Sequence, residues 1–137
     1  MAHPLPPAGM VAAGLLAGLA ACGPQAGAEV TEAPFAPEYL GGAAAVLDGD
    51  LIEVKVAMKG ARDGADIDAY TRCVAAKYTV GKGYGFLRHV RTNVDEKGGV
   101  RRADAVYTIS PDLPRGSMTI DAEVALAECA ERKIPTV

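Results

Sequence analysis

Hydrophobic and polar residues alternate along one stretch in the middle of the chain, residues 50–58. The apolar side chains on one face of this stretch are Ile52, Val54, Val56 and Met58. An apolar residue at every second position is the period of a β-strand with one buried face. Asp48-Gly49 separates this stretch from the apolar residues 43–47, and Asp-Gly between apolar runs favours a hairpin in which both turn positions have positive φ. The pattern therefore predicts two paired strands over residues 43–58.

A helical period comes next in the chain. One stripe at intervals of three and four residues consists of Ile67, Tyr70, Val74 and Tyr78. This spacing predicts a helix over residues 66–80 that turns the stripe toward the core. Asp63 or Asp66 can cap the first turn, and Gly81 or Gly83 can end the helix in the left-handed conformation.

The rest of the chain predicts three more strands. Residues 84–94 and 100–110 are strand-like, and Gly98-Gly99 supplies the turn between them. Residues 117–128 are rich in alanine, which favours a helix, but apolar and polar residues alternate there and we expect a strand. The order ββαβββ predicts an α+β fold, an antiparallel sheet of about five strands with one helix packed on one face.

The first 22 residues have a different character. Residues 10–21 are uncharged and apolar, too short to span a bilayer but long enough for the core of a signal peptide. They end in Leu19-Ala20-Ala21-Cys22, which resembles the lipobox of bacterial lipoproteins. The resemblance implies that residues 1–21 are a signal peptide and that Cys22 becomes a lipidated N-terminus anchored in a membrane. Gly23, rather than Asp, follows the cysteine, which by the same resemblance implies the outer membrane, facing the periplasm.

The segment after Cys22 links this motif to the folded part of the chain. Residues 22–40 are rich in Pro, Gly and Ala and are typical of a flexible tether, which leaves residues 41–137 for a single small domain. Residues 1–9 contain no Lys or Arg, unlike typical signal peptides. The alternative is therefore a cytosolic protein with an uncleaved alanine-rich N-terminus.

Two further cysteines follow the one assigned to the lipid. In an exported domain, Cys73 and Cys129 are an even pair and we expect them to form a disulfide. Aromatic residues make up only 5% of the chain, and a domain with so few large side chains benefits from a covalent link. The alternative is two separate buried thiols.

Charge and motifs exclude several classes of function. A net charge of −3 gives no basic surface for nucleic acid, so we expect no nucleic-acid partner. His89 is the only histidine after Cys22, and we expect no metal site, no cofactor and no catalytic set. The glycines at 81, 83 and 85 are interpreted as a helix end rather than a phosphate loop, and Asp63, Asp66 and Asp68 as helix-capping residues rather than part of a calcium loop.

The clearest functional feature is a group of arginines in the predicted hairpin over residues 84–110. They are Arg88, Arg91, Arg101 and Arg102. If the two strands pair, Arg88 with Arg102, or Arg91 with Arg101, can share a face and bind carboxylates or phosphates of an anionic envelope component. The alternative is a solvated face whose charges oppose pairing at a sheet edge.

Cys73 and the run Gly83-Tyr84-Gly85-Phe86 give the body of the chain a pattern that resembles small proteobacterial envelope lipoproteins of unassigned function. We therefore expect a lipid-anchored envelope protein that works as a non-enzymatic binding or structural module. Its expected partners are the membrane, through Cys22, and an anionic envelope component or another envelope protein. A small lipid-anchored hydrolase is the alternative of a different class.

Overall fold

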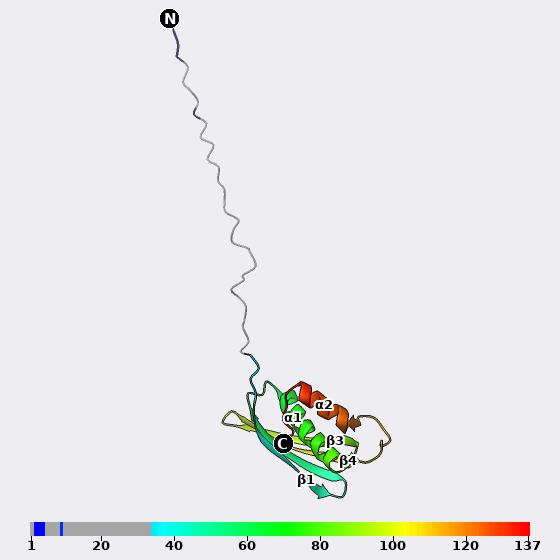
Figure 1. The fold of residues 1–137 in the computed structure, drawn as a ribbon. Helices are drawn as coiled ribbons and strands as arrows, with labels where there is room; N and C mark the ends of the chain where they lie inside the picture. The colour runs from blue at the N-terminus through cyan, green and yellow to red at the C-terminus, as the bar shows by residue number, and fades with distance from the viewer. Residues whose placement is uncertain (1, 5–8, 10–33) are drawn as a thin grey trace. The chain divides into compact units, whose positions relative to one another are not determined.

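The computed structural model describes residues 2–4, 9 and 34–137. Cys22 and most of the expected signal peptide and tether therefore lie outside the described residues. Every helix and strand described belongs to the unit formed by residues 34–137 (Figure 1).

Five strands form one sheet, and both helices lie on the same side of it (Figure 1). The elements in chain order are β1 (Glu38–Asp48), β2 (Leu51–Lys59), α1 (Gly64–Gly81), β3 (Phe86–Lys97), β4 (Val100–Ser110), β5 (Ile120–Asp121) and α2 (Ala122–Glu131). The strands are ordered β1-β2-β4-β3-β5, and each pair of neighbours is antiparallel. The predicted α+β class with a five-stranded antiparallel sheet is confirmed.

The hydrophobic core lies between the sheet and α1. The alternation in β2 is confirmed, because the four side chains predicted to face the core are at most 4% exposed. On α1, Ile67, Tyr70 and Val74 are buried against them, while Tyr78 is only half-buried. Asp63 caps α1, since its carboxylate accepts a hydrogen bond from the backbone N–H of Ala65 at 3.0 Å.

The expectation of a strand over residues 117–128 is wrong, and with it the expectation of a single helix. Only Ile120 and Asp121 extend the sheet, and the chain then enters α2. The Asp121 carboxylate accepts hydrogen bonds from the backbone N–H groups of Glu123 and Val124, which starts a helix at this point. The buried residues of α2 are Ala122, Ala125 and Cys129, at helical rather than alternating spacing.

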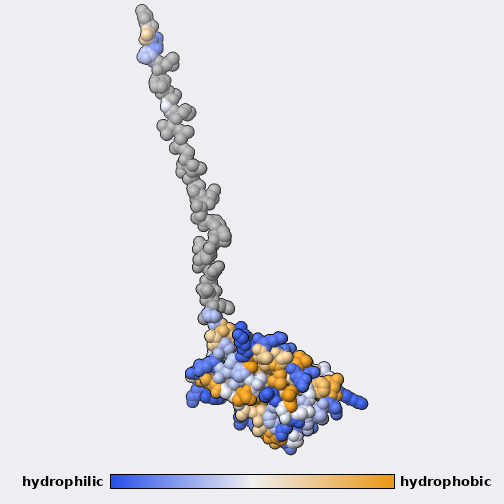
Figure 2. All heavy atoms as spheres, in the orientation of Figure 1, coloured by the Kyte–Doolittle hydropathy of each residue, from blue (hydrophilic) through white to orange (hydrophobic). Residues whose placement is uncertain are grey.

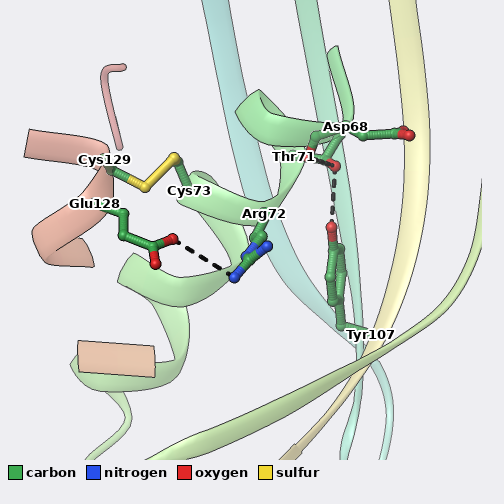
Figure 3. The surroundings of a disulfide bond; sticks show 7 residues. All are labelled: Asp68, Thr71, Arg72, Cys73, Tyr107, Glu128 and Cys129. Atoms are coloured by element: carbon green, nitrogen blue, oxygen red, sulfur yellow. Dashed lines mark hydrogen bonds and ion pairs between the residues drawn. A yellow bond between two sulfur atoms is a disulfide. The ribbon is translucent and has the colours of Figure 1, made fainter. Parts of the chain in front are cut away.

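The expected disulfide between Cys73 and Cys129 is present, with Cα atoms 5.9 Å apart, and Figure 3 shows it linking α1 to α2. The sequence predicts a bond between a helix and the end of a strand. Because residues 122–131 are helical, the bond instead joins the two helices that cover the sheet. It closes a loop between residues 56 positions apart in the sequence.

The first hairpin is longer than expected and turns one residue later. β1 begins at Glu38 rather than near residue 43, and the Tyr39 ring packs edge-on against Tyr70, with ring centroids 4.8 Å apart. The strands are joined by Gly49 and Asp50, of which only Gly49 has a positive φ, +55°. A shift in register between Val46 and Asp48 moves the turn away from the expected Asp48-Gly49.

Candidate functional site: the open face of the sheet

The side of the sheet that the helices leave uncovered carries rows of charged and polar side chains. In one row, Lys55 on β2 lies opposite Asp104 on β4, which lies opposite Asn93 on β3. Directly opposed residues of antiparallel strands share a face, so these three side chains project from the same side. We call this side the open face. Its central residues are Glu53, Lys55, Ala57, Arg91, Asn93, Asp95, Arg102, Asp104 and Val106.

A groove of about 470 Å³ crosses the open face. Its lining includes Gly41, Lys55, Ala57, Asn93, Asp95, Arg102 and Asp104. Gly41 and Ala57 are directly opposed on β1 and β2, and their small size leaves room between the longer side chains of the neighbouring strands. The volume is within the range of sites that hold small molecules or short segments of a polymer.

Charges of both signs line this groove. The Lys55 Nζ atom lies 3.1 Å from the Glu53 carboxylate at its border. The hydrogen bond from Lys55 lowers the pKa of Glu53, against the opposing effect of burial, and the positive charges of Lys55 and Arg91 lower it further. Glu53 therefore remains ionised at neutral pH, and the groove presents fixed positive and negative charges side by side.

One oxygen of Asp104 distinguishes the groove from an ordinary charged surface. Its Oδ1 atom is buried and has no hydrogen-bond partner among the described residues, although Lys55 lies directly opposite. A buried acceptor without a partner is destabilising by about 1–3 kcal/mol. Because this oxygen is covered, a ligand would reach it only if the side chains around it shift, and an N–H or O–H donated there would then remove the penalty.

The four arginines identified in the sequence differ in the face of the sheet that they occupy and in their partners. Arg91 and Arg102 lie on the open face, and within residues 34–137 neither forms an ion pair with an acidic side chain. Arg88 also lies on this side, but its guanidinium donates to the Arg115 carbonyl at 2.8 Å and to Thr119 Oγ1 at 3.3 Å. Arg101 points to the helix side, where it pairs with Glu96 at 3.1 Å.

A β-bulge explains why Arg91 and Arg101 do not share a face. The register between β3 and β4 shifts between His89 and Arg91, which leaves Val90 without an opposite residue. Arg91 therefore lies opposite Val106, on the open face, while Arg101 remains on the other. Arg88 and Arg102 do share a side, but Arg102 lies opposite Asp95, far along β3 from Arg88.

The remaining candidate residues have structural partners. His89 Nε2 is bonded to Thr92 Oγ1 at 2.6 Å, and its ring packs edge-on against Tyr107. Asp66 is buried and accepts from the Arg62 backbone and side chain, which holds the pKa of this carboxyl below its usual value. Within the described residues, no group of His, Cys, Asp or Glu is arranged to hold a metal ion.

A second hollow, of about 300 Å³, lies between α1 and α2 beside the disulfide. Its charged lining residues are Asp68, Arg72, Glu128 and Arg132. Arg72 and Glu128 reach across it to within 3.7 Å of each other, so two of these charges already compensate one another.

In residues 2–4, 9 and 34–137, no helix is both long enough and apolar enough to cross a membrane.

Sequence reasoning missed Lys55, Asn93 and Asp104 as members of one site. The alternation in residues 50–58 already placed Lys55 on the face away from the core. What it did not provide is the pairing of β2 with β4, two strands separated in the chain by α1 and β3. That pairing is what sets Lys55 opposite Asp104.

Comparison with known proteins places the folded part of the chain in a family. The model of the YNQ4 C-terminal domain matches residues 39–133, which run from β1 past α2 and include both disulfide cysteines. A relative described as "Uncharacterized 26.9 kDa protein in nqo8 5'region", from Paracoccus denitrificans, is 33% identical over 85 residues. These cover 62% of this chain and 33% of the relative, so the match spans about a third of that protein's length. No solved structure matches significantly.

Proposed function

The chain belongs to the YNQ4 C-terminal domain family, and on that premise we propose that this domain is a binding module of the bacterial cell envelope. It is tethered to a membrane by lipid on Cys22 and binds its ligand in the groove of the open face, without catalysis.

Two features of the chain support the envelope location. The lipobox-like Leu19-Ala20-Ala21-Cys22 precedes a Pro-, Gly- and Ala-rich stretch of a length suited to a tether. The domain itself carries the Cys73–Cys129 disulfide, a bond that persists in oxidising compartments and is rare in the cytosol. Lipid chains on Cys22 and on its amine would together give stable anchoring, which one chain alone does not.

The observation that carries the binding role is the groove with the unpartnered Asp104 Oδ1. Arg102 and Lys55 supply cations for a carboxylate or phosphate, and Asp104 supplies an acceptor for an amine or amide. The complementary ligand is an envelope component that carries both kinds of group within a short span. A purely anionic ligand would leave Asp104 and Asp95 facing it with like charge.

The location is tested by mass spectrometry of the intact protein from cells and by fractionation. We expect the wild-type chain to begin at Cys22, to carry lipid and to be found in the membrane fraction. We expect the Cys22→Ala variant to be absent from that fraction. A full-length, unmodified chain that begins at Met1 in the soluble fraction would contradict the location while leaving the binding role open.

The binding role is tested by NMR titration of the whole chain, carrying Cys22→Ser, with soluble cell-wall glycopeptides and, separately, with phosphatidylglycerol vesicles. We expect the glycopeptides to shift amide signals around Lys55, Asn93 and Arg102, and Arg102→Glu to abolish the shifts. Lys77→Glu, the same charge change on exposed α1, is the matched control and should bind normally. Shifts confined to the helix side, or no shifts at all, would contradict the assignment.

A further inference from the structure

The two edges of the sheet differ in the features that keep their unpaired backbone groups from pairing with another chain. β5 pairs with only Phe86 and Leu87, so the rest of β3 forms one edge. That edge carries the bulge at Val90 and five charged side chains, Arg88, Arg91, Asp95, Glu96 and Lys97. Bulges and charges are the features that prevent an edge strand from pairing with another chain.

The opposite edge, β1, is regular only between its two register shifts at Leu40 and Leu47, and the C-terminal residues Thr136 and Val137 lie beside its middle on the helix side. No charged residue lies between Glu38 and Asp48, and the middle of the strand is Gly41, Gly42, Ala43, Ala44 and Ala45. Leu40, Val46 and Leu47 are 43%, 50% and 50% exposed. Figure 2 shows hydrophobic residues reaching the lower margin of the domain, where Figure 1 draws β1. An exposed, neutral edge strand offers its free N–H and C=O groups to another strand.

We propose that β1 pairs with β1 of a second copy of this chain, antiparallel and about a twofold axis at Ala43. Opposed residues of an antiparallel pair must share a face. Gly42 and Ala44 lie opposite Val56 and Val54 and face the helices, while Ala43 faces the other way. An axis at Ala43 satisfies this condition, because it sets Gly42 against Ala44 of the partner copy.

The size pattern of β1 favours a copy of itself as the partner strand. Small residues extend on both sides of Ala43, so the side chains of the two paired strands would not crowd one another on either face of the sheet. Leu40 at one end and Val46 at the other are equally distant from Ala43, and the twofold axis brings each toward the other in the partner. The apolar groups now exposed would cover each other, as in a self-complementary interface.

Charge sets the expected salt dependence of this pairing. Glu38 and Asp48 lie at the two ends of β1, and the twofold axis brings them toward each other across the interface. Both are exposed, so salt screens their repulsion. The dimer should therefore strengthen as ionic strength rises.

Pairing through β1 would also join the two binding faces. Because opposed strands keep their faces, the open faces of both copies would lie on one side of a continuous sheet. Gly41 of β1 lines the groove, so each groove would lie beside the junction. This last consequence rests on the proposed function, whereas the pairing itself does not.

The test uses the whole chain with Cys22→Ser, so that lipid cannot hold copies together. We expect sedimentation equilibrium to show a concentration-dependent dimer that Ala43→Lys weakens by about tenfold or more, as expected for a charge placed at a paired edge. Val90→Lys, which adds the same charge at an exposed position on the β3 edge, should leave the dimer unchanged. A monomer at all concentrations, at low and high salt, would overturn the proposal.

Oxidative cross-linking tests the register even if Ala43→Lys fails to fold. Ala43→Cys places a thiol opposite its own symmetry mate, within the Cα spacing that a disulfide accepts. Ala45→Cys, two residues from the axis, has Gly41 opposite it and should cross-link much less. Equal or faster cross-linking of Ala45→Cys would overturn the axis at Ala43.

Discussion

The two faces of the sheet are built from the same strands but present different kinds of side chain. On the helix side, β2 and β4 present Ile52, Val54, Ala105 and Tyr107, each at most 2% exposed and packed beneath α1. One residue along each strand, the open face presents Lys55, Asp104 and other charged groups. The alternation of a β-strand thus lets one sequence serve both packing and the recognition that we propose.

The two faces also differ in whether their buried polar atoms have hydrogen-bond partners. On the helix side, the Thr71 hydroxyl donates to the Asp68 carbonyl, so the Tyr107 hydroxyl is the donor in the 3.0 Å bond between Tyr107 and Thr71. Thr79 donates to the Ala75 carbonyl at 2.7 Å. On the open face, Asp104 Oδ1 has no partner. The buried side-chain atoms without a partner among the described residues are Asp104 Oδ1 and Arg88 Nε, both from residues on the open side, and of the two only Asp104 lines the groove.

The largest expected effect concerns the disulfide behind the helix side. Cys73→Ser or Cys129→Ser should lower the free energy of unfolding by about 4 kcal/mol, the chain-entropy value for a loop of this length. The double variant should lose little more than either single variant, because both remove the same bond. Thermal and urea unfolding measure the three variants.

Wild-type protein kept in reductant is the control for these serine variants, and its stability should fall to the same level. Ligand titration at the open face, performed below the lowered melting temperature, should give an unchanged affinity. Additive losses from the two serine changes, or an affinity that falls with them, would contradict the separation of the two faces.

A smaller effect is expected from the buried hydroxyl pair. Tyr107→Phe removes the donor to Thr71 and should destabilise the domain by about 1 kcal/mol. Burial raises the pKa of Tyr107, so the phenol is protonated over the whole neutral range and the loss should not depend on pH there. A double-mutant cycle with Thr71→Val measures the coupling, and a coupling near zero would mean that this bond does not stabilise the helix side.

The sequence predicted the parts of the fold in which local pattern and burial agree. Val100–Ser110 is a strand with the expected bounds, because Gly98 and Gly99 adopt the positive φ of the turn before it. Residues 117–128 were assigned wrongly because alanine is weakly hydrophobic, so their alternation carried little information about burial. Val124 was expected to face the core and is 55% exposed. The cap at Asp121 was the local signal that favoured a helix.

The candidate site was harder to predict than the fold. Arg102 was identified from charge density alone, and the structure places it on the open face. The bulge at Val90 determines which face of the sheet the other arginines occupy, and no local pattern in the sequence predicts this bulge. Lys55 and Asp104 meet through the pairing of strands that are not consecutive, and such pairing follows from the whole topology rather than from any local pattern.

The ion pair at the start of α1 should give an effect below about 1 kcal/mol, because the Arg62 side chain is 60% exposed and solvent screens it. Arg62 lowers the folded-state pKa of Asp66, so this contribution is present above the unfolded-state pKa, near 4, and disappears as the pH falls through the folded-state value. Asp66→Asn should therefore be less stable than wild type at pH 7 and approach it at pH 2–3. Urea unfolding across this range measures the difference, and a gap that widens in acid would contradict the pairing.

The smallest effect on stability, and the sharpest test of the comparison, is expected at Asp104. Replacing it with Ala removes a buried acceptor that has no partner, so the free energy of unfolding should stay within about 0.5 kcal/mol of wild type or rise. The matched control is Asp66→Ala, which removes a carboxylate that is bonded to Arg62 and should lower stability measurably. In the glycopeptide titration the order should reverse, with Asp104→Ala losing the shifts and Asp66→Ala retaining them. If Asp104→Ala instead unfolds as easily as Asp66→Ala while still binding, then Asp104 supports the fold and the open face is not the recognition surface.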